Sequence, residues 1–480
     1  MTSVTKILFT VSEAVPFVAT GGMGQVAGAL SAALKKLHPR KYDIRVVMPL
    51  YGAFRAQYQE ELKFVGETTV QLAWRNQYCG IFTYKHGHVT YYFVDNRHYF
   101  DREGVYGYDD DGERFAFFSK AVFSVMELAD FVPDVVHAHD WQSALVPIYV
   151  KTRFADKYPD MKTVFTIHNL EYQGKFGHGL VTEVFDLRKE EVPLVEYDGC
   201  INLIKGAVVC ADKLTTVSPS YAWEIQNGGG FGLDAILQEN SSKLSGIING
   251  IDYEAYNPET DPVLDKNYTM ETLDNKTANK MKLQSLFGLP VSPRTMVICV
   301  VSRLVSHKGM DLITYRMNEL LDLDLQFVLL GTGDHAYELF FSEKAVSHPS
   351  KLAVNFTFNP ELAMKVFSGA DVVLMPSHSE PCGLVQMIAC RYGSIPIVRK
   401  VGGLGDTIRD CRAGDGNGFV FDEYNADLLL DTIVQALDLY KYREEDWKNL
   451  MKHAMSSDFS WDVSAKAYGK IYEALARGQV

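Results

Sequence analysis

Short apolar runs alternate with longer amphipathic stretches along most of the chain. The first series of strand-like runs falls at residues 7–11, 44–48, 91–94, 135–137, 163–167, 214–217 and 246–248, and the second at 296–301, 326–330, 352–355, 372–375, 395–398 and 419–420. Between residues 257 and 293 the pattern gives way to polar sequence rich in Asp and Asn. Strands that alternate with helices are typical of parallel α/β sheets. The pattern therefore predicts two Rossmann-like lobes that join near residues 245–260.

The length of the chain supports this division. A chain of 480 residues is too long for one ordinary core. We expect an N-terminal Rossmann-like lobe over residues 1–245 and a C-terminal Rossmann-like lobe over residues 246–458. The amphipathic stretch 461–476 predicts a last helix, so that residues 459–480 close the structure by packing back on the N-terminal lobe.

Two glycine loops, one in each predicted lobe, share the order strand, loop, helix. Thr20-Gly21-Gly22 follows the first apolar run, and Lys400-Val401-Gly402-Gly403 follows the run at 395–398. Backbone N–H groups at such a place can approach an anion at the positive end of a helix dipole. One such loop is an ordinary turn in many α/β proteins. A matched pair favours a phosphate-bearing ligand that binds in a central cleft faced by both sheets.

Charge and cysteine content narrow the partners and the compartment. The net charge of -13 argues against nucleic acid and against an anionic membrane as partners. The seven cysteines are scattered without a C-x-x-C pair, which favours reduced thiols over disulfides or zinc. No apolar run approaches the ~18 residues of a membrane span, and the start of the chain does not resemble a signal segment. The sequence predicts a cytoplasmic enzyme with no membrane partner.

Two cations follow the strand-like run at 296–301. Arg303 and Lys308 stand five positions apart, and a rigid guanidinium fork beside a compact ammonium suits a diphosphate. The alternative is that both are surface side chains at the start of a helix. That placement is unfavourable against the helix dipole unless an anion is present, so we favour the diphosphate.

A carboxylate follows the run at 372–375. Glu380 precedes Cys382-Gly383-Leu384 at the expected start of a helix, where it could clamp sugar hydroxyls together with free N–H groups. The alternative is that Glu380 only caps the helix. Cys382 could be a nucleophile, but no His or Asp stands in a recognisable pattern to activate it. We expect a packing and backbone-contact role for Cys382.

Histidines gather at the expected strand ends of the first half. His137, His139 and Asp140 suggest a metal site at first sight. Side chains alternate along a strand, so at most two of them could share a ligand, and no second cluster has matching spacing. We expect no metal. His168, after the run at 163–167, is either a polar contact to substrate or a core histidine.

Taken in order, these motifs resemble the bacterial and plant-type glycogen (starch) synthases, the retaining ADP-glucose-dependent glycosyltransferases of the GT-B fold. The resemblance runs from residue 6 to about residue 475 without large gaps. The other motifs that carry it are Ser12-Glu13, 111–115, 165–174, 211–219 and Asn249-Gly250-Ile251-Asp252.

The resemblance implies a role for each matching position. Arg303 and Lys308 would neutralise the diphosphate, and Glu380 would hold glucose hydroxyls. His168 and Asp140 would contact the sugar from the N-terminal lobe. The remaining substrate-binding positions would be Gly21, Gly22, Asn249, Phe358, Cys382, Gly383, Leu384, Gly402 and Gly403, with Phe358 stacked on adenine.

The resemblance also implies an activity. Glucose would pass from ADP-glucose to the non-reducing end of an α-1,4-glucan with retention at the anomeric carbon, without metal or other cofactor. Residues 1–245 would serve the acceptor and residues 246–458 the nucleotide sugar. Two departures leave alternatives open, because Ala19 and Gln25 stand where the family usually has Lys and an acidic residue. These alternatives are a related transferase that uses UDP-glucose or another acceptor, and a weakly active glucan-binding or regulatory paralogue.

Overall fold

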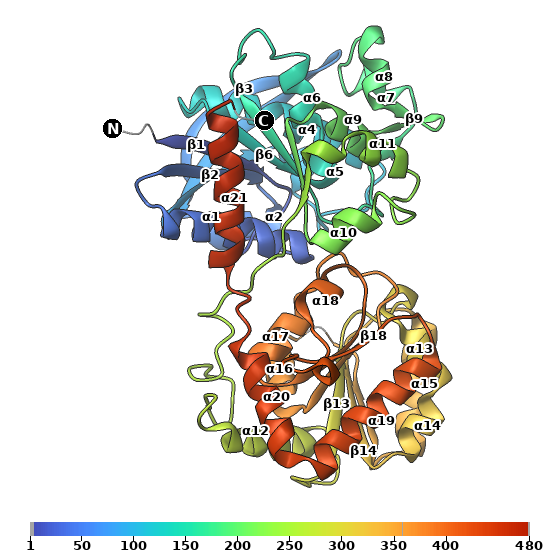
Figure 1. Ribbon diagram of the computed structural model, residues 1–480. Coiled ribbons are helices and arrows are strands. Elements are labelled where there is room, and N and C mark those ends of the chain that lie inside the picture. Colours follow the sequence, from blue (N-terminus) through green and yellow to red (C-terminus); the bar gives the residue numbers. More distant parts are fainter. Residues whose placement is uncertain (1–3, 358, 479–480) are drawn as a thin grey trace. The chain divides into compact units, whose positions relative to one another are not determined.

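The protein divides into two compact units, each with its own mainly or wholly parallel sheet (Figure 1). The computed structural model describes residues 4–357 and 359–478. Unit 1 comprises Met1–Gly250 and Trp461–Val480, and unit 2 comprises Ile251–Ser460. The chain therefore leaves unit 1 after Gly250 and returns to it for the last helix.

Unit 1 is built on a nine-stranded sheet in the order β12-β11-β7-β6-β1-β2-β5-β4-β3. The strands are β1 (Thr5–Thr10), β2 (Tyr42–Pro49), β3 (Lys63–Leu72), β4 (Arg75–His86), β5 (Val89–Asp95), β6 (Val135–His139), β7 (Lys162–Ile167), β11 (Lys213–Thr216) and β12 (Leu244–Gly246). The seven strands from β12 to β5 pair in parallel. Apart from β12, which is half-buried, these strands are mostly buried, as expected for strands covered on both faces.

The edge of this sheet corrects the sequence prediction. β3 and β4 pair antiparallel with each other and β4 pairs antiparallel with β5, so the sheet is not parallel throughout. Residues along β3 are mostly exposed or half-buried. A strand of this kind lacks the continuous apolar run by which the buried strands were found. The strand expected at 246–248 lies two residues earlier, at Leu244–Gly246.

Helices cover the sheet of unit 1, and the last one comes from the far end of the chain. The helices are α1 (Gly22–Leu37), α2 (Gly52–Tyr58), α3 (Arg97–Phe100), α4 (Asp111–Leu128), α5 (Asp140–Ser143), α6 (Leu145–Lys151), α7 (Leu180–Glu183), α8 (Val192–Val195), α9 (Leu203–Cys210), α10 (Pro219–Glu224), α11 (Asp234–Glu239) and α21 (Trp461–Ala476). A small sheet of β8 (Lys175–Phe176), β10 (Cys200–Asn202) and β9 (Glu196–Tyr197) lies among them.

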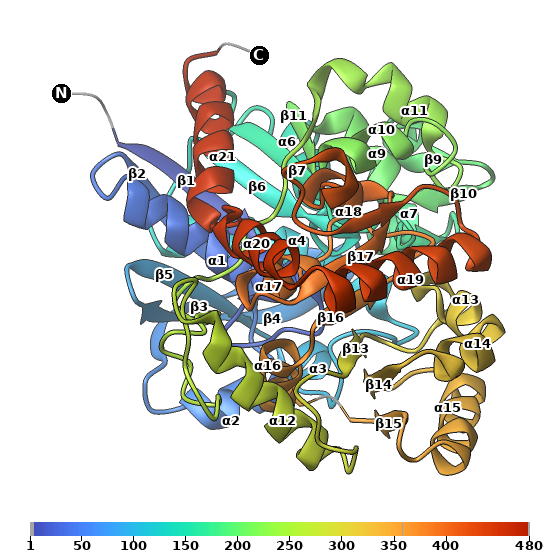
Figure 2. The same ribbon diagram turned by 60° about the horizontal axis from the view of Figure 1, so that its bottom comes forward.

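Helix α21 lies beside α1 in both views (Figures 1 and 2). Its Tyr472 is fully buried, and the Tyr472 hydroxyl lies 2.7 Å from His137 Nδ1 on β6. Lys41 and Glu473 form an ion pair between β2's start and the same helix. The buried Tyr472 and the partly exposed ion pair together hold α21 against the rest of unit 1.

Unit 2 contains a six-stranded parallel sheet in the order β15-β14-β13-β16-β17-β18. Its strands are β13 (Met296–Val301), β14 (Leu325–Leu330), β15 (Leu352–Asn355), β16 (Val372–Met375), β17 (Ile395–Arg399) and β18 (Phe419–Phe421). Its helices are α12 (Lys276–Leu286), α13 (Met310–Tyr315), α14 (Met317–Asp322), α15 (His335–Ser347), α16 (Pro360–Gly369), α17 (Val385–Arg391), α18 (Gly402–Thr407), α19 (Ala426–Tyr442) and α20 (Glu444–Ser456). No helix in the described ranges is long and apolar enough to cross a membrane.

The polar stretch at 257–293 folds onto unit 2 through buried polar contacts. Lys276 on α12 is buried, and its ammonium donates to Ser368 O at 2.7 Å and to Ser394 Oγ at 3.0 Å. Burial lowers the pKa of Lys276 to about 7. The Tyr268 hydroxyl donates to Tyr392 O at 2.8 Å. A segment with little apolar sequence is therefore held by satisfied hydrogen bonds.

Candidate functional site

The candidate residues of unit 2 gather where β13, β16 and β17 end. These three strands are neighbours in the sheet. Arg303 follows β13, Glu380 follows β16, and Gly402 follows β17 at the start of α18. The carboxyl ends of parallel strands lie at one edge of the sheet, which is where open α/β sheets bind ligands.

Lys308 and Glu380 form an ion pair at this edge. Lys308 Nζ lies 2.7 Å from Glu380 Oε2, and Ser377 Oγ donates to the same oxygen at 3.2 Å. Glu380 is 6% exposed, so its charge needs these donors. Arg303 is exposed, and its side chain has no ion pair or hydrogen bond within residues 4–357 and 359–478. The site therefore has one cation engaged by a carboxylate and one whose donors are all available.

The second glycine loop packs directly on the segment that carries Glu380. Gly402 has φ +43, and a Cβ there would lie 2.1 Å from Glu380 O. A Cβ on Gly403 would lie 2.2 Å from Cys382 O. The Gly403 N–H donates to Glu380 O at 3.1 Å. Only glycine permits this approach of two backbones, which fixes the position of Glu380.

The segment from Cys382 to Leu384 makes the turn into α17. Cys382 is buried, and Gly383 has φ +77. Gln386 Nε2 donates to Cys382 O at 3.0 Å and to Gly383 O at 3.1 Å. Leu384 is the residue before α17, which begins without a side-chain cap. The carbonyls of Cys382 and Gly383 therefore accept hydrogen bonds from the Gln386 side chain. The N–H groups of the turn lie at a helix start that has no side-chain cap.

In unit 1, Asp140 and His168 meet at the ends of β6 and β7. Asp140 Oδ1 accepts the backbone N–H of His168 at 2.7 Å. Burial raises the pKa of Asp140 to about 7, against the lowering effect of the N–H groups of His168 and Asn169. Burial lowers the pKa of His168 to about 3, so its imidazole is neutral near pH 7. The pair therefore provides a carboxyl that is easily protonated and a neutral ring.

The histidines expected near these residues are hydrogen-bonded to other side chains. His139 Nδ1 lies 2.9 Å from His168 Nε2. His137 Nε2 lies 2.6 Å from Thr166 Oγ1, while its Nδ1 faces Tyr472. Burial lowers the pKa of His137 and of His139 well below the usual value. Within the described part of the chain, no group of three His, Cys, Asp or Glu could hold a metal ion.

The first glycine loop is anchored by a carboxylate that sequence reasoning used only as a family marker. Glu13 is 3% exposed and accepts hydrogen bonds from the Thr20 N–H and, at 2.8 Å, from Thr20 Oγ1. Burial raises the pKa of Glu13, and the N–H groups of Thr20, Gly24 and Gly21 oppose the shift. In the sequence, the available signal was an acidic residue in the segment between β1 and the glycine loop. Glu13 accepts hydrogen bonds from groups that precede α1.

Gly21, Gly22 and Asn249 complete the candidate set of unit 1. A Cβ on Gly21 or on Gly22 would have no atom within 4 Å, and both residues are exposed. Asn249 is 6% exposed, and its Oδ1 has no hydrogen-bond partner among the described residues. Phe358, expected as an adenine platform, lies outside the described residues.

Comparison with known proteins covers nearly the whole chain. Residues 6–239 match a family model described as starch synthase catalytic domain, and residues 287–452 match one described as glycosyl transferases group 1. The chain is 44% identical over 479 residues to a glycogen synthase of Geobacillus thermodenitrificans, with 98% of each chain covered. It is 44% identical over 477 residues to a glycogen synthase of Streptococcus pneumoniae, covering 98% of this chain and 99% of that one.

Solved structures give the same result. The catalytic domain of starch synthase IV from Arabidopsis thaliana, bound to ADP and acarbose, matches with a TM-score of 0.91 and 31% identity, covering 99% of this chain and 100% of that one. Sucrose-phosphate synthase from Thermosynechococcus elongatus shares only the fold. It matches with a TM-score of 0.62 and 16% identity, covering 99% of this chain and 100% of that one. These matches confirm the predicted two-domain α/β fold of the GT-B type. The chain belongs to the glycogen and starch synthase family of glycosyltransferases.

Proposed function

We propose that the protein transfers glucose from ADP-glucose to the non-reducing end of an α-1,4-glucan, with retention at the anomeric carbon. Relatives named glycogen synthase, and a similar structure that holds ADP and acarbose, support this proposal. The observation that carries it is the Lys308–Glu380 pair at the carboxyl edge of the unit 2 sheet, the edge at which the exposed Arg303 also follows its strand.

We assign donor binding to unit 2 because its cations suit a diphosphate. The bond between glucose C1 and the phosphate oxygen breaks during transfer, and negative charge grows on the leaving ADP. Arg303 offers a guanidinium without an ion pair among the described residues. The ammonium of Lys308 is held in place by Glu380, with Lys308 Nζ 2.7 Å from Glu380 Oε2. Positioned cations of this kind stabilise developing charge without reorganising during the reaction.

We assign sugar contacts to groups in both units. In unit 2 these are Glu380 and the N–H groups of Cys382 and Gly383, with Leu384, Gly402 and Gly403 shaping the turn. In unit 1, His168 is neutral, and its Nδ1 makes no hydrogen bond to a described residue, so this nitrogen is available to a hydroxyl. Asp140 holds the His168 backbone in place.

We assign further contacts with the substrates to three residues. Gly21 and Gly22, which are exposed, would contribute backbone groups, and Asn249 would contribute its side-chain amide. The buried, unpartnered Asn249 Oδ1 lacks the hydrogen bond that buried polar groups usually have. None of the seven cysteines forms a disulfide, which supports our proposal that the enzyme works in the reducing cytoplasm.

The test is a transfer assay with radiolabelled ADP-glucose or UDP-glucose and glycogen as acceptor. We expect label to enter glycogen from ADP-glucose, and β-amylase to release it as maltose, because that enzyme cleaves α-1,4 bonds from non-reducing ends. Preference for UDP-glucose, or binding of glycogen without transfer, would overturn the proposal. Those results would favour the alternatives that Ala19 and Gln25 leave open.

A further inference from the structure

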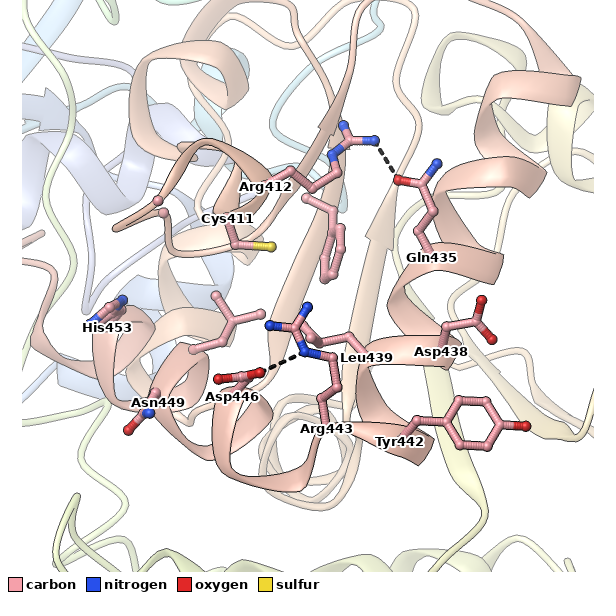
Figure 3. A pocket seen from close by; sticks show the side chains of 14 residues that line it. Cys411, Arg412, Gln435, Asp438, Leu439, Tyr442, Arg443, Asp446, Asn449 and His453 are labelled. Carbon is pink, nitrogen blue, oxygen red and sulfur yellow. Dashed lines mark hydrogen bonds and ion pairs between the residues drawn. The ribbon is translucent and has the colours of Figure 1, made fainter.

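Unit 2 has a cavity made from residues that the proposed reaction does not use. A cavity of about 730 Å³ is bordered by the loop 411–416, β18, and helices α19 and α20 (Figure 3). Its lining residues all lie between Cys411 and His453. Small-molecule sites in proteins usually have volumes of about 300 to 1,000 Å³. The cavity is large enough for a ligand.

The cavity has an apolar floor and a polar rim. Phe419 and Leu450 are buried at 2% and 4% exposure. Above them, Asn449 on α20 is exposed and makes no hydrogen bond with its side chain to any described residue. Gln435 on α19 accepts from Arg412 at 2.7 Å, which leaves its Nε2 without a described partner. The rim therefore presents free donors and acceptors from both α19 and α20.

The charges of the lining residues cancel. The lining contains two arginines, Arg412 and Arg443, and two aspartates, Asp438 and Asp446. Arg412 is further paired with Asp410, and Arg443 Nε donates to Asp446 Oδ2 at 2.6 Å. Figure 3 shows Arg412 hydrogen-bonded to Gln435 and Arg443 paired with Asp446. A site for phosphate would leave a positive surplus, so this balance favours a neutral ligand with many hydroxyls.

We propose that this cavity binds a segment of a neutral α-glucan, away from the residues assigned to glucose transfer. A sugar hydroxyl is both donor and acceptor, which suits the mixed amides, carboxylates and guanidinium of the rim. Tyr442, 78% exposed at the end of α19, offers a flat apolar face beside them. The identity of the polymer rests on the proposed function.

A second contact on the same polymer raises the effective concentration of the chain ends that the enzyme extends. This benefit exists only when one glucan is long enough to reach both places. The cavity therefore improves the use of glycogen and leaves the use of short oligosaccharides unchanged.

The test compares three variants of the full chain. Gln435→Ala/Asn449→Ala removes two rim amides without changing charge, and Tyr442→Ala removes the exposed ring. Glu445→Ala/Lys452→Ala, on exposed α20 positions outside the lining, is the control with unchanged net charge. The melting temperature of each variant is measured first to establish that it folds.

Glycogen binding is measured by affinity electrophoresis. The kinetics of glucose transfer are measured with glycogen and with maltotriose as acceptors. We expect the rim variant to bind glycogen about tenfold more weakly, from the loss of two hydrogen bonds, and to show a higher KM for glycogen. kcat, the donor KM and the kinetics with maltotriose should match those of the control. Tyr442→Ala should weaken glycogen binding in the same way.

Unchanged glycogen binding in both folded cavity variants would overturn the inference. So would competition by millimolar inorganic phosphate for this site, since that would identify an anion site instead. If the protein binds glycogen through the cavity but transfers no glucose, the proposed function fails and the inference stands. If it transfers glucose normally and the cavity variants behave like the control, the inference alone fails.

Discussion

The two glycine loops look alike in sequence but need their glycines for different reasons. In unit 2, Gly402 and Gly403 are packed so closely that added Cβ atoms would lie 2.1 and 2.2 Å from backbone oxygens. In unit 1, Gly21 and Gly22 face open space. Packing within the protein explains why the second loop needs glycine. At the first loop no protein atom requires glycine, so we attribute its glycines to the approach of a ligand.

The surroundings of the two loops also differ in charge. The second loop lies against Glu380, which is paired with Lys308, and the exposed Arg303 follows the neighbouring strand β13. The first loop is bound to the buried carboxylate of Glu13, which has no ion pair within the described part of the chain. One matched sequence pattern thus marks a cationic site in unit 2 and a carboxylate-anchored turn in unit 1.

Substituting one glycine in each loop tests the steric half of this comparison. Gly403→Ala should lower the free energy of unfolding of unit 2 by about 3 kcal/mol, because the backbone of Cys382 cannot move out of the way. Gly22→Ala should change stability by less than about 0.5 kcal/mol while lowering kcat/KM for the donor. Calorimetric unfolding and donor kinetics measure both effects. Equal stability losses in the two variants would contradict the comparison.

Removing the free cation of unit 2 tests the electrostatic half. Arg303→Ala should reduce kcat about a hundredfold, a loss of about 3 kcal/mol in transition-state stabilisation, with a smaller effect on donor binding. Arg294→Ala is the matched control, because Arg294 is exposed before the start of β13, whereas Arg303 follows its end. The measurement is steady-state kinetics of both variants with ADP-glucose. Normal turnover of Arg303→Ala would contradict the assignment of Arg303 to the donor site.

The sequence alone predicted the buried elements well. The apolar runs at 296–301, 352–355 and 372–375 coincide with β13, β15 and β16, and the amphipathic stretch 461–476 coincides with α21. A strand that is buried on both faces shows a continuous apolar run, and a helix that is buried on one face shows apolar residues at the helical period. Both patterns can be recognised in the sequence. The hairpin of β3 and β4 was missed because exposed antiparallel strands do not need a continuous apolar run.

Candidate site residues could be chosen from the sequence because they follow strands whose ends share one edge. Their mutual contacts could not be predicted in the same way. His139 and His168 lie 29 positions apart and meet only because β6 and β7 pair with His139 opposite Thr166. The anchoring of the first loop by Glu13 depends on how the chain turns back after β1. These are properties of register and of loop path, which local patterns do not encode.

The half-buried carboxyl of Asp140 in unit 1 gives a pH-dependent test. In the folded protein the pKa of Asp140 is about 7, above its ordinary value of 3.8, so the folded state holds the proton more tightly. Asp140 therefore destabilises unit 1 increasingly as the pH rises from about 4 to 7. The stability advantage of Asp140→Asn over the wild type should grow by roughly 2–3 kcal/mol between pH 5 and pH 8. The measurement is the melting temperature at both pH values, with Asp156→Asn at an exposed position as control. A gain that shrinks as the pH rises would refute the assignment.

Adding a cation to the first loop is the mildest test of the contrast between the two loops. Ala19 is exposed next to Thr20, whose N–H and hydroxyl are taken by Glu13. A lysine there would place a mobile positive charge at an open loop, where an exposed ionic contact contributes about 0.2–1 kcal/mol. Ala19→Lys should therefore raise kcat/KM for ADP-glucose about two- to fivefold at low ionic strength, and salt should reduce the gain. Ala32→Lys, at an exposed position further along α1, is the matched control and should have no effect. If both lysine variants behave alike, the first loop does not contact the anionic donor, and its open glycines need another explanation.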